Sequence, residues 1–453
     1  FWGTISTWLQ QALYVVLVAG YLEKFIPLTE VTSFMVKITM IVVFTVINLL
    51  GIREVSQVST VLSIAVLAGF TVVTIVGFAN WNYSPVEPFM PPEQGLVESL
   101  GGSICIAIWM YCGYETMANV AGELEDPQVI PKGLRLAMPI IALSYFLPTM
   151  AGIVSVGQWE NWATEGEEAV GYMDVLITYA GPVFGVMFLI VAILSQCSIF
   201  NAYIASGSRG FFVMADDHLF PQFMVRLSKK RKVPAVSIIT MAFFTILLCR
   251  WDFTTLVMAT TPLMLYLYIA LAVATRRLRK IYPVEERKAK GLFVIPGGNL
   301  GLNFMTAMPI VVSLIALYVN GTEYFISGFL MLFISLVGYL ICKWAYGGLY
   351  KLDPERYPIN PRTRLAMGDT KQISIYFILC GIAALLGSVL LYLYEGEWGE
   401  EYYLEVYETG FFSDFWGMLD ACRWGGIAMI LCGMVILMIS RKLEKPVEYQ
   451  QTS

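Results

Sequence analysis

The chain has 453 residues, of which 57% are hydrophobic and 14% are charged, and its mean hydropathy is +0.68. Soluble domains are about 45–50% apolar and about 25% charged, so the composition excludes an ordinary soluble enzyme and a disordered chain. It is typical of a polytopic membrane protein. The net charge of −5 also excludes the basic surface that nucleic-acid binding requires.

Apolar runs long enough to cross a bilayer, about 20 residues each, recur along the whole chain. They predict an all-α polytopic membrane protein with twelve spans, at residues 6–22, 31–51, 58–78, 101–121, 138–157, 179–205, 236–250, 253–275, 304–319, 323–346, 372–394 and 422–440.

The charges of the connecting segments predict the orientation of these spans. Of the 29 Lys and Arg residues, all but four lie in or beside the loops that follow even-numbered spans, or in the C-terminal tail. The exceptions are Lys24, Lys37, Arg250 and Arg423. By the positive-inside rule, these connections and the C-terminus are cytoplasmic. The opposite connections, at 160–168 and 395–420, are acidic. Phe1 would then lie on the cytoplasmic side, so we expect an even number of helices before it.

The fourth span carries the ionisable residue that lies deepest in an apolar run. Glu115 closes the sequence Trp109-Met110-Tyr111-Cys112-Gly113-Tyr114-Glu115, in which Gly113 favours an unwound helix. Unwound backbone inside a membrane is tolerated where it lines a cavity or meets a ligand. The rings of Trp109 and Tyr111 can close over a cationic substrate, and a desolvated Glu115 can carry a proton. The alternative is a lone Glu that hydrogen-bonds to a neighbouring helix.

Other ionisable residues in the spans fall near span ends, where their side chains can reach the membrane surface. They are Lys37, Asp174, Asp252, Lys343 and Arg423. Ser195, Gln196, Ser198, Asn201 and Ser206 are polar residues along the sixth span. Such residues form hydrogen bonds between helices or contact a substrate.

The sequence shows neither the spacing of metal-binding residues nor a set of catalytic residues. The eight cysteines show no CxxC or Cys/His spacing, and the spans offer no His, paired acids or nucleophile–base set. We therefore expect no enzyme activity, no metal and no cofactor. Filter-like repeats that would indicate a channel are also missing from the sequence.

Several motifs together resemble the amino acid–polyamine–organocation (APC) superfamily of transporters. Trp109–Glu115, followed by Gly122–Pro127 and Ile130-Pro131-Lys132, resembles helix 6 of these proteins, and its W-x-x-x-G-x-E pattern is close to the basic amino acid/polyamine antiporter group. Three further segments resemble parts of these proteins. Phe1–Leu22 resembles helix 3, Asn48–Gly51 resembles the end of helix 4, and Ser208–Pro221 resembles the loop after helix 8. The resemblance covers about residues 1–345.

The resemblance implies a LeuT-like fold of two five-helix inverted repeats, with helices 1 and 2 absent. It divides the chain into 1–78 (helices 3–5 of the first repeat), 79–275 (helices 6–10, the second repeat), 276–346 (helices 11 and 12), and 347–453. The last part holds a cytoplasmic loop, two extra helices and the C-terminal tail.

The resemblance also implies roles for individual residues. Trp109 matches the gate aromatic residue, Gly113 the unwound glycine and Glu115 the coupling carboxylate. The matched substrate-binding positions are Trp109, Met110, Tyr111, Cys112, Gly113, Gln10, Gln11 and Ser198. Gln10 and Gln11 are amides where some polyamine-type relatives carry an acid, which argues against a strongly polycationic substrate. Residues 58–78 lack the lysine of some proton-coupled members, which favours exchange over symport.

The predicted function is secondary transport of amino acids by alternating access. Amino acid exchange is the first hypothesis, and proton-coupled symport of an amino acid or polyamine is the alternative. The expected partners are a small-molecule substrate, membrane lipid and, in the symport alternative, protons; homo-oligomerisation stays open. The expected location is the cytoplasmic membrane.

Overall fold

The computed structural model describes residues 2–23, 26–87, 107, 110–126, 128–157, 171–290, 292–360, 362–366 and 369–443. These residues are nearly all helical, and the sole β feature among them is an isolated bridge between Ile359 and Ala366. Ten of their helices are long and apolar enough to cross a membrane: α1 (Trp2–Glu23), α2 (Glu30–Leu50), α3 (Ile52–Ala79), α5 (Val129–Val156), α8 (Pro182–Asp216), α10 (Phe253–Ile281), α12 (Gly298–Val319), α13 (Gly321–Tyr346), α14 (Asp369–Glu395) and α16 (Phe415–Leu443).

Shorter helices connect or flank these spans. They are η1 (Tyr114–Glu123), α7 (Tyr172–Ala180), η2 (Gln222–Val225), α9 (Ala235–Leu248), α11 (Val284–Ala289), η3 (Gly348–Lys351), α15 (Gly399–Tyr407) and η4 (Phe411–Ser413). The seventh predicted span is α9, which has 14 residues. Most of the other helices extend beyond the predicted apolar runs, because polar residues at membrane-helix ends continue the backbone hydrogen bonding. The chain is an integral, multi-pass membrane protein.

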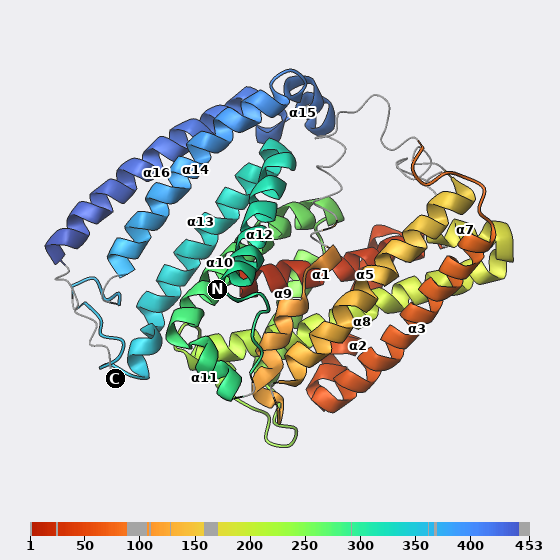
Figure 1. The fold of residues 1–453 in the computed structure, drawn as a ribbon, viewed down its shortest axis with the longest axis horizontal. Helices are drawn as coiled ribbons and strands as arrows, with labels where there is room; N and C mark the ends of the chain where they lie inside the picture. The colour runs from red at the N-terminus through yellow and green to blue at the C-terminus, as the bar shows by residue number, and fades with distance from the viewer. Residues whose placement is uncertain are drawn as a thin grey trace.

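The helices form one group around α1, with a separate helical pair along one edge (Figure 1). α1 packs against α8 and α10, while α3 packs against α5 and α8. On α1, the side chains of Ala12, Leu13 and Val15 are fully buried. α14 and α16 lie side by side at one edge and contact the rest of the molecule through α12 and α13.

Small residues allow α14 and α16 to approach closely. A Cβ at Gly381 would lie 2.6 Å from the backbone oxygen of Gly426, and one at Gly433 would lie 2.9 Å from that of Ser374. Ser374 Oγ donates a hydrogen bond to the Gly433 oxygen at 2.9 Å. Close backbone contact through Gly and Ser is how membrane helices associate without a hydrophobic driving force.

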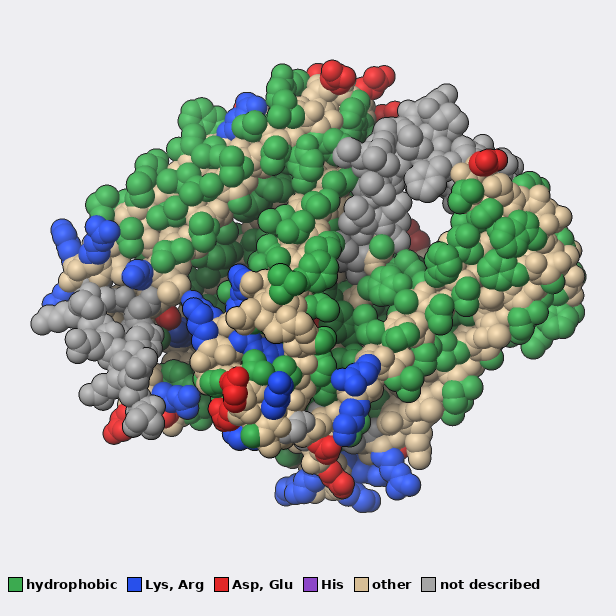
Figure 2. All heavy atoms as spheres, in the orientation of Figure 1, with side chains coloured by type: hydrophobic (Ala, Val, Ile, Leu, Met, Phe, Trp, Pro, Cys, Tyr) green, Lys and Arg blue, Asp and Glu red, His purple; other side chains and the backbone are tan. Residues whose placement is uncertain are grey.

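Charged and apolar side chains separate on the molecular surface (Figure 2). Apolar side chains cover the visible flanks of the long helices, and most visible Lys and Arg side chains lie in the lower half of the view and at its left end. Exposed apolar residues such as Val61 and Ile64, each more than 60% exposed on α3, suit a surface in contact with lipid tails.

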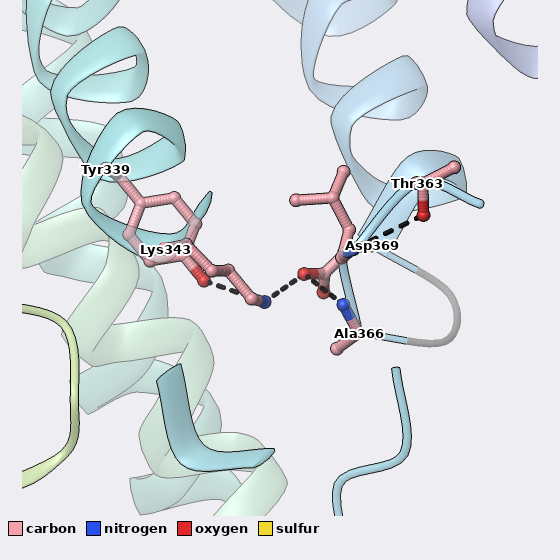
Figure 3. Close-up of polar contacts among 6 residues, drawn as sticks. Tyr339, Lys343, Thr363, Ala366 and Asp369 are labelled. Atoms are coloured by element: carbon pink, nitrogen blue, oxygen red, sulfur yellow. Dashed lines mark hydrogen bonds and ion pairs between the residues drawn. The ribbon is translucent and has the colours of Figure 1, made fainter. Parts of the chain in front are cut away.

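Lys343 departs from the prediction that it extends to the membrane surface. It is 7% exposed near the end of α13, where its Nζ forms an ion pair with Asp369 at the start of α14 and donates to Tyr339 Oη at 3.3 Å (Figure 3). Asp369 also accepts a hydrogen bond from the Ala366 backbone N–H at 3.2 Å. The prediction failed because the loop between α13 and α14 folds over the lysine and brings a carboxylate to it.

Two carboxyl groups at the other end of α13 are also buried, although Glu395 was assigned to an acidic loop. Glu395, 1% exposed, accepts hydrogen bonds from the Thr322 backbone N–H (3.2 Å) and from Tyr403 Oη (3.0 Å). Glu323, 9% exposed, accepts from Tyr407 Oη. Burial came from α15, which covers the helix ends and supplies both tyrosines. α14 is therefore joined to α13 by buried polar contacts at both ends.

Candidate functional site

The helix that carries the predicted site is broken at Gly113. Met110 and Tyr111 are helical, Cys112 and Gly113 are not, and a 3₁₀ helix, η1, starts at Tyr114. Gly113 has φ +107°, in the left-handed region that favours glycine. A Cβ at this position would also lie 2.7 Å from Tyr203 Oη on α8, so both conformation and space require glycine.

The side chains that follow the break satisfy its backbone groups. The Gly113 N–H donates to Glu115 Oε2 at 3.0 Å. The Gly113 carbonyl accepts from the Thr116 N–H at 3.1 Å and from Thr116 Oγ1 at 2.6 Å. The break is thus a defined turn that holds the Glu115 carboxylate against its own backbone.

Tyrosine hydroxyls from two other helices reach the same turn. Tyr268 Oη on α10 donates to Glu115 Oε2 at 3.2 Å, and its ring stacks on Tyr114 with a centroid distance of 6.0 Å. Tyr145 Oη on α5 donates to the Met110 carbonyl at 3.0 Å. Within the described residues, no Lys or Arg forms an ion pair with Glu115. A half-buried carboxyl group held by neutral donors remains able to bind a cationic ligand.

Gln10 and Gln11, the predicted substrate-binding residues on α1, contact different parts of the structure. Gln10, 1% exposed, donates from Nε2 to Cys112 Sγ at 2.7 Å and so lies at the break. Gln11 is fully buried but donates to the Met241 carbonyl on α9 at 3.3 Å, away from Gly113. Adjacent residues on a helix point about 100° apart, so both amides could not face one site.

One further predicted residue, Ser198, is not joined to the break by a hydrogen bond among the described residues. It is buried on α8. Trp109 lies outside the described residues. The structure therefore brings together Met110, Tyr111, Cys112, Gly113, Glu115 and Gln10.

Three tyrosines at the break were missed by reading the sequence. Tyr268, Tyr203 and Tyr145 lie far from Glu115 in the chain and reach it, or the turn beside it, through packing. The signal that could have found them is a hydroxyl inside an otherwise apolar span, since a buried tyrosine usually has a hydrogen-bond partner.

No group of three or more His, Cys, Asp or Glu residues that could hold a metal ion occurs in the described part of the chain. The chemistry available at the break is therefore that of a carboxyl group, phenol hydroxyls, an amide and backbone oxygens. These groups can bind an ammonium group and exchange protons.

A family model described as amino acid permease matches residues 1–331, which include α1 to α12 and the break at Gly113. The chain belongs to the amino acid permease family. This family is part of the APC superfamily, in agreement with the motif around Gly113 and Glu115.

The permease is similar to several curated transporters. It is 26% identical over 328 residues to a probable polyamine transporter of Arabidopsis thaliana, covering 68% of the permease and 62% of the relative. It is 26% identical to the polyamine transporter RMV1 of the same plant, covering 69% and 63%. The vacuolar cationic amino acid transporter 8 of Arabidopsis thaliana is 24% identical, with 53% and 40% covered. The permease thus spans less than two thirds of the length of each of these relatives.

Proposed function

We propose that this permease transports amino acids or amines across a membrane by alternating access, with the substrate ammonium group bound at the break around Gly113. The observation that carries the proposal is the Glu115 carboxyl group, held over a broken helix by the Gly113 N–H and Tyr268 Oη and without a basic partner in the described part of the chain. A substrate ammonium group would supply the missing positive charge.

Glu115 would couple occupancy of the site to helix movement. Its hydrogen bond with Tyr268 joins the broken helix to α10, a long helix that packs against α1, α12 and α13. Both described donors lie on Oε2, so an ammonium group can bind Oε1 while Tyr268 still holds the carboxylate in place, and η1 and α10 would then respond to occupancy together. A proton on Glu115 would compete with the substrate, since a neutral carboxyl group binds an ammonium group weakly.

The proposed substrate is a primary amine or a cationic amino acid. The relatives named as polyamine and cationic amino acid transporters favour this class. Gln10 places an amide rather than an acid beside Cys112, so one carboxylate serves one ammonium group at the break. We propose exchange as the mode of transport, with proton-coupled symport as the second candidate because Glu115 can carry a proton.

Uptake by the full-length protein in proteoliposomes tests both modes. Labelled arginine and labelled putrescine are offered outside, with or without unlabelled substrate inside, and with or without an inward proton gradient. We expect uptake that requires internal substrate. Uptake into empty vesicles driven by the proton gradient would replace exchange by symport, and no uptake of either compound would refute the proposed substrate class.

Glu115→Gln tests the coupling role. The amide preserves size and can accept a hydrogen bond from Tyr268, but it carries no charge. We expect transport to be lost while the protein remains monodisperse in detergent with an unchanged melting temperature. Asp420→Asn is the matched control, because Asp420 is exposed and pairs with Arg423 far from the break. Wild-type transport by Glu115→Gln would refute the coupling role.

A further inference from the structure

A cavity of about 270 Å³ lies between α1, α3, α7 and α8, apart from the break at Gly113. Its wall includes Tyr21 of α1, Phe70 of α3, Tyr172 and Asp174 of α7, and Gln196 of α8. Cavities that hold drug-sized ligands are about 300–1,000 Å³, so this volume suits a small ligand.

The polar groups of this cavity include acceptors that can take up further donors. Asp174 lines the cavity, and its Oδ2 accepts a hydrogen bond from the Gly171 N–H at 2.7 Å. Gln196 Oε1 is buried and has no hydrogen-bond partner among the described residues. Burial of an unpaired amide oxygen is unfavourable, so a bound N–H donor would stabilise the amide once it turned toward the cavity.

Aromatic rings also line the cavity. The rings of Phe70, Tyr172 and Phe188 contact one another with centroid distances of 5.9, 6.0 and 6.2 Å. No Lys or Arg is among the described residues that line the cavity. A carboxylate, an unpaired oxygen and aromatic faces together fit an alkylammonium ion, whose charge and methylene groups need such neighbours.

The cavity and the break both involve residues of α1 and α8. Tyr21 and Gln196 line the cavity, and the residues seven positions earlier on α1 and seven later on α8 are Tyr14 and Tyr203. Seven residues are close to two helical turns, so each pair shares a helix face at a spacing of about 10 Å. The rings of Tyr14 and Tyr203 contact each other at 5.3 Å, and Tyr203 Oη lies beside Gly113.

We propose that this cavity is a second binding site for a small primary amine, about two helical turns from the break along α1 and α8. Asp174 binds the ammonium group, the Gln196 side chain turns its amide oxygen toward one of the N–H groups, and the cluster of three rings contacts the alkyl chain. The proposal rests on the proposed function, because the amine held here would be a transported substrate on its way to or from Glu115.

Equilibrium binding of labelled putrescine to the purified full-length protein tests the second site without transport. The parent protein for the test is Glu115→Gln, in which ammonium binding at the break is removed. We expect it to retain saturable putrescine binding. Adding Asp174→Asn should weaken that binding about tenfold or more, as expected for loss of a charged hydrogen-bond partner. The asparagine oxygen can still accept from the Gly171 N–H, so the start of α7 should remain folded.

Two further variants separate a local site from a general charge effect. Gln196→Leu should weaken putrescine binding in the Glu115→Gln protein, and Asp420→Asn should not. Absence of saturable binding in Glu115→Gln, or unchanged binding after Asp174→Asn, would overturn the second site. These results are independent of the proposed function, which fails only if the wild-type protein transports neither putrescine nor arginine.

Discussion

The hydrogen bond between Tyr268 and Glu115 gives the sharpest test of the site. Tyr268→Phe removes the hydroxyl that donates to Glu115 Oε2 at 3.2 Å and leaves the ring that stacks on Tyr114. Hydrogen bonds to charged groups contribute about 1.5–3 kcal/mol, and the length of this bond favours the lower value. A loss of about 1.5 kcal/mol is roughly a tenfold change in an equilibrium constant.

The assay is equilibrium binding of labelled substrate to purified protein. We expect Tyr268→Phe to raise Kd about tenfold, because Glu115 keeps the Gly113 N–H as a donor but loses its attachment to α10. Tyr266→Phe is the matched control, since it removes a hydroxyl two residues away on the same helix, and that hydroxyl forms no hydrogen bond with Glu115. The control should bind substrate as the wild type does.

A double-mutant cycle then decides whether Tyr268 acts through Glu115. If it does, Tyr268→Phe should change the Kd of the Glu115→Gln protein little. The effects of the two substitutions on the binding free energy should then depart from additivity by about 1 kcal/mol or more. Unchanged Kd in Tyr268→Phe, or effects of the two substitutions that add within about 0.5 kcal/mol, would refute the role of this bond.

Three further predictions concern the attachment of α14 and α16. Lys343→Met leaves Asp369 without its buried partner and should destabilise the protein by about 3 kcal/mol; proteolysis of the 347–368 loop should become faster, and unchanged cleavage would contradict this. Glu395→Ala removes the acceptor of three buried donors and should lower the melting temperature in detergent, whereas an equal melting temperature would show that water replaces the carboxylate. Gly381→Leu overpacks the contact with α16 and should lower the free energy of unfolding by about 1–3 kcal/mol. Gly425→Leu should leave it unchanged, because a side chain at Gly425 meets open space.

The sequence by itself determined ten of the twelve predicted spans and the position of the break, while much of the predicted span 101–121 lies outside the described residues. Apolar runs of about 20 residues predict membrane helices because the bilayer requires both length and internal backbone hydrogen bonding. Gly113 marked the break because its conformation is a local property: φ +107° is accessible to glycine at little cost. Membership of the permease family was also readable from the motif around Gly113 and Glu115.

Only the tertiary structure decided which side chains meet at the site. The neighbours Gln10 and Gln11 are identical in type, yet one reaches Cys112 and the other reaches α9. Tyr268 is separated from Glu115 by 153 positions, and no local pattern pairs them. Lys343 and Glu395 were expected near water because they end their apolar runs, but a loop and α15 cover them. Burial depends on neighbours that are distant in sequence, whereas helix formation and backbone conformation depend on residues that are adjacent.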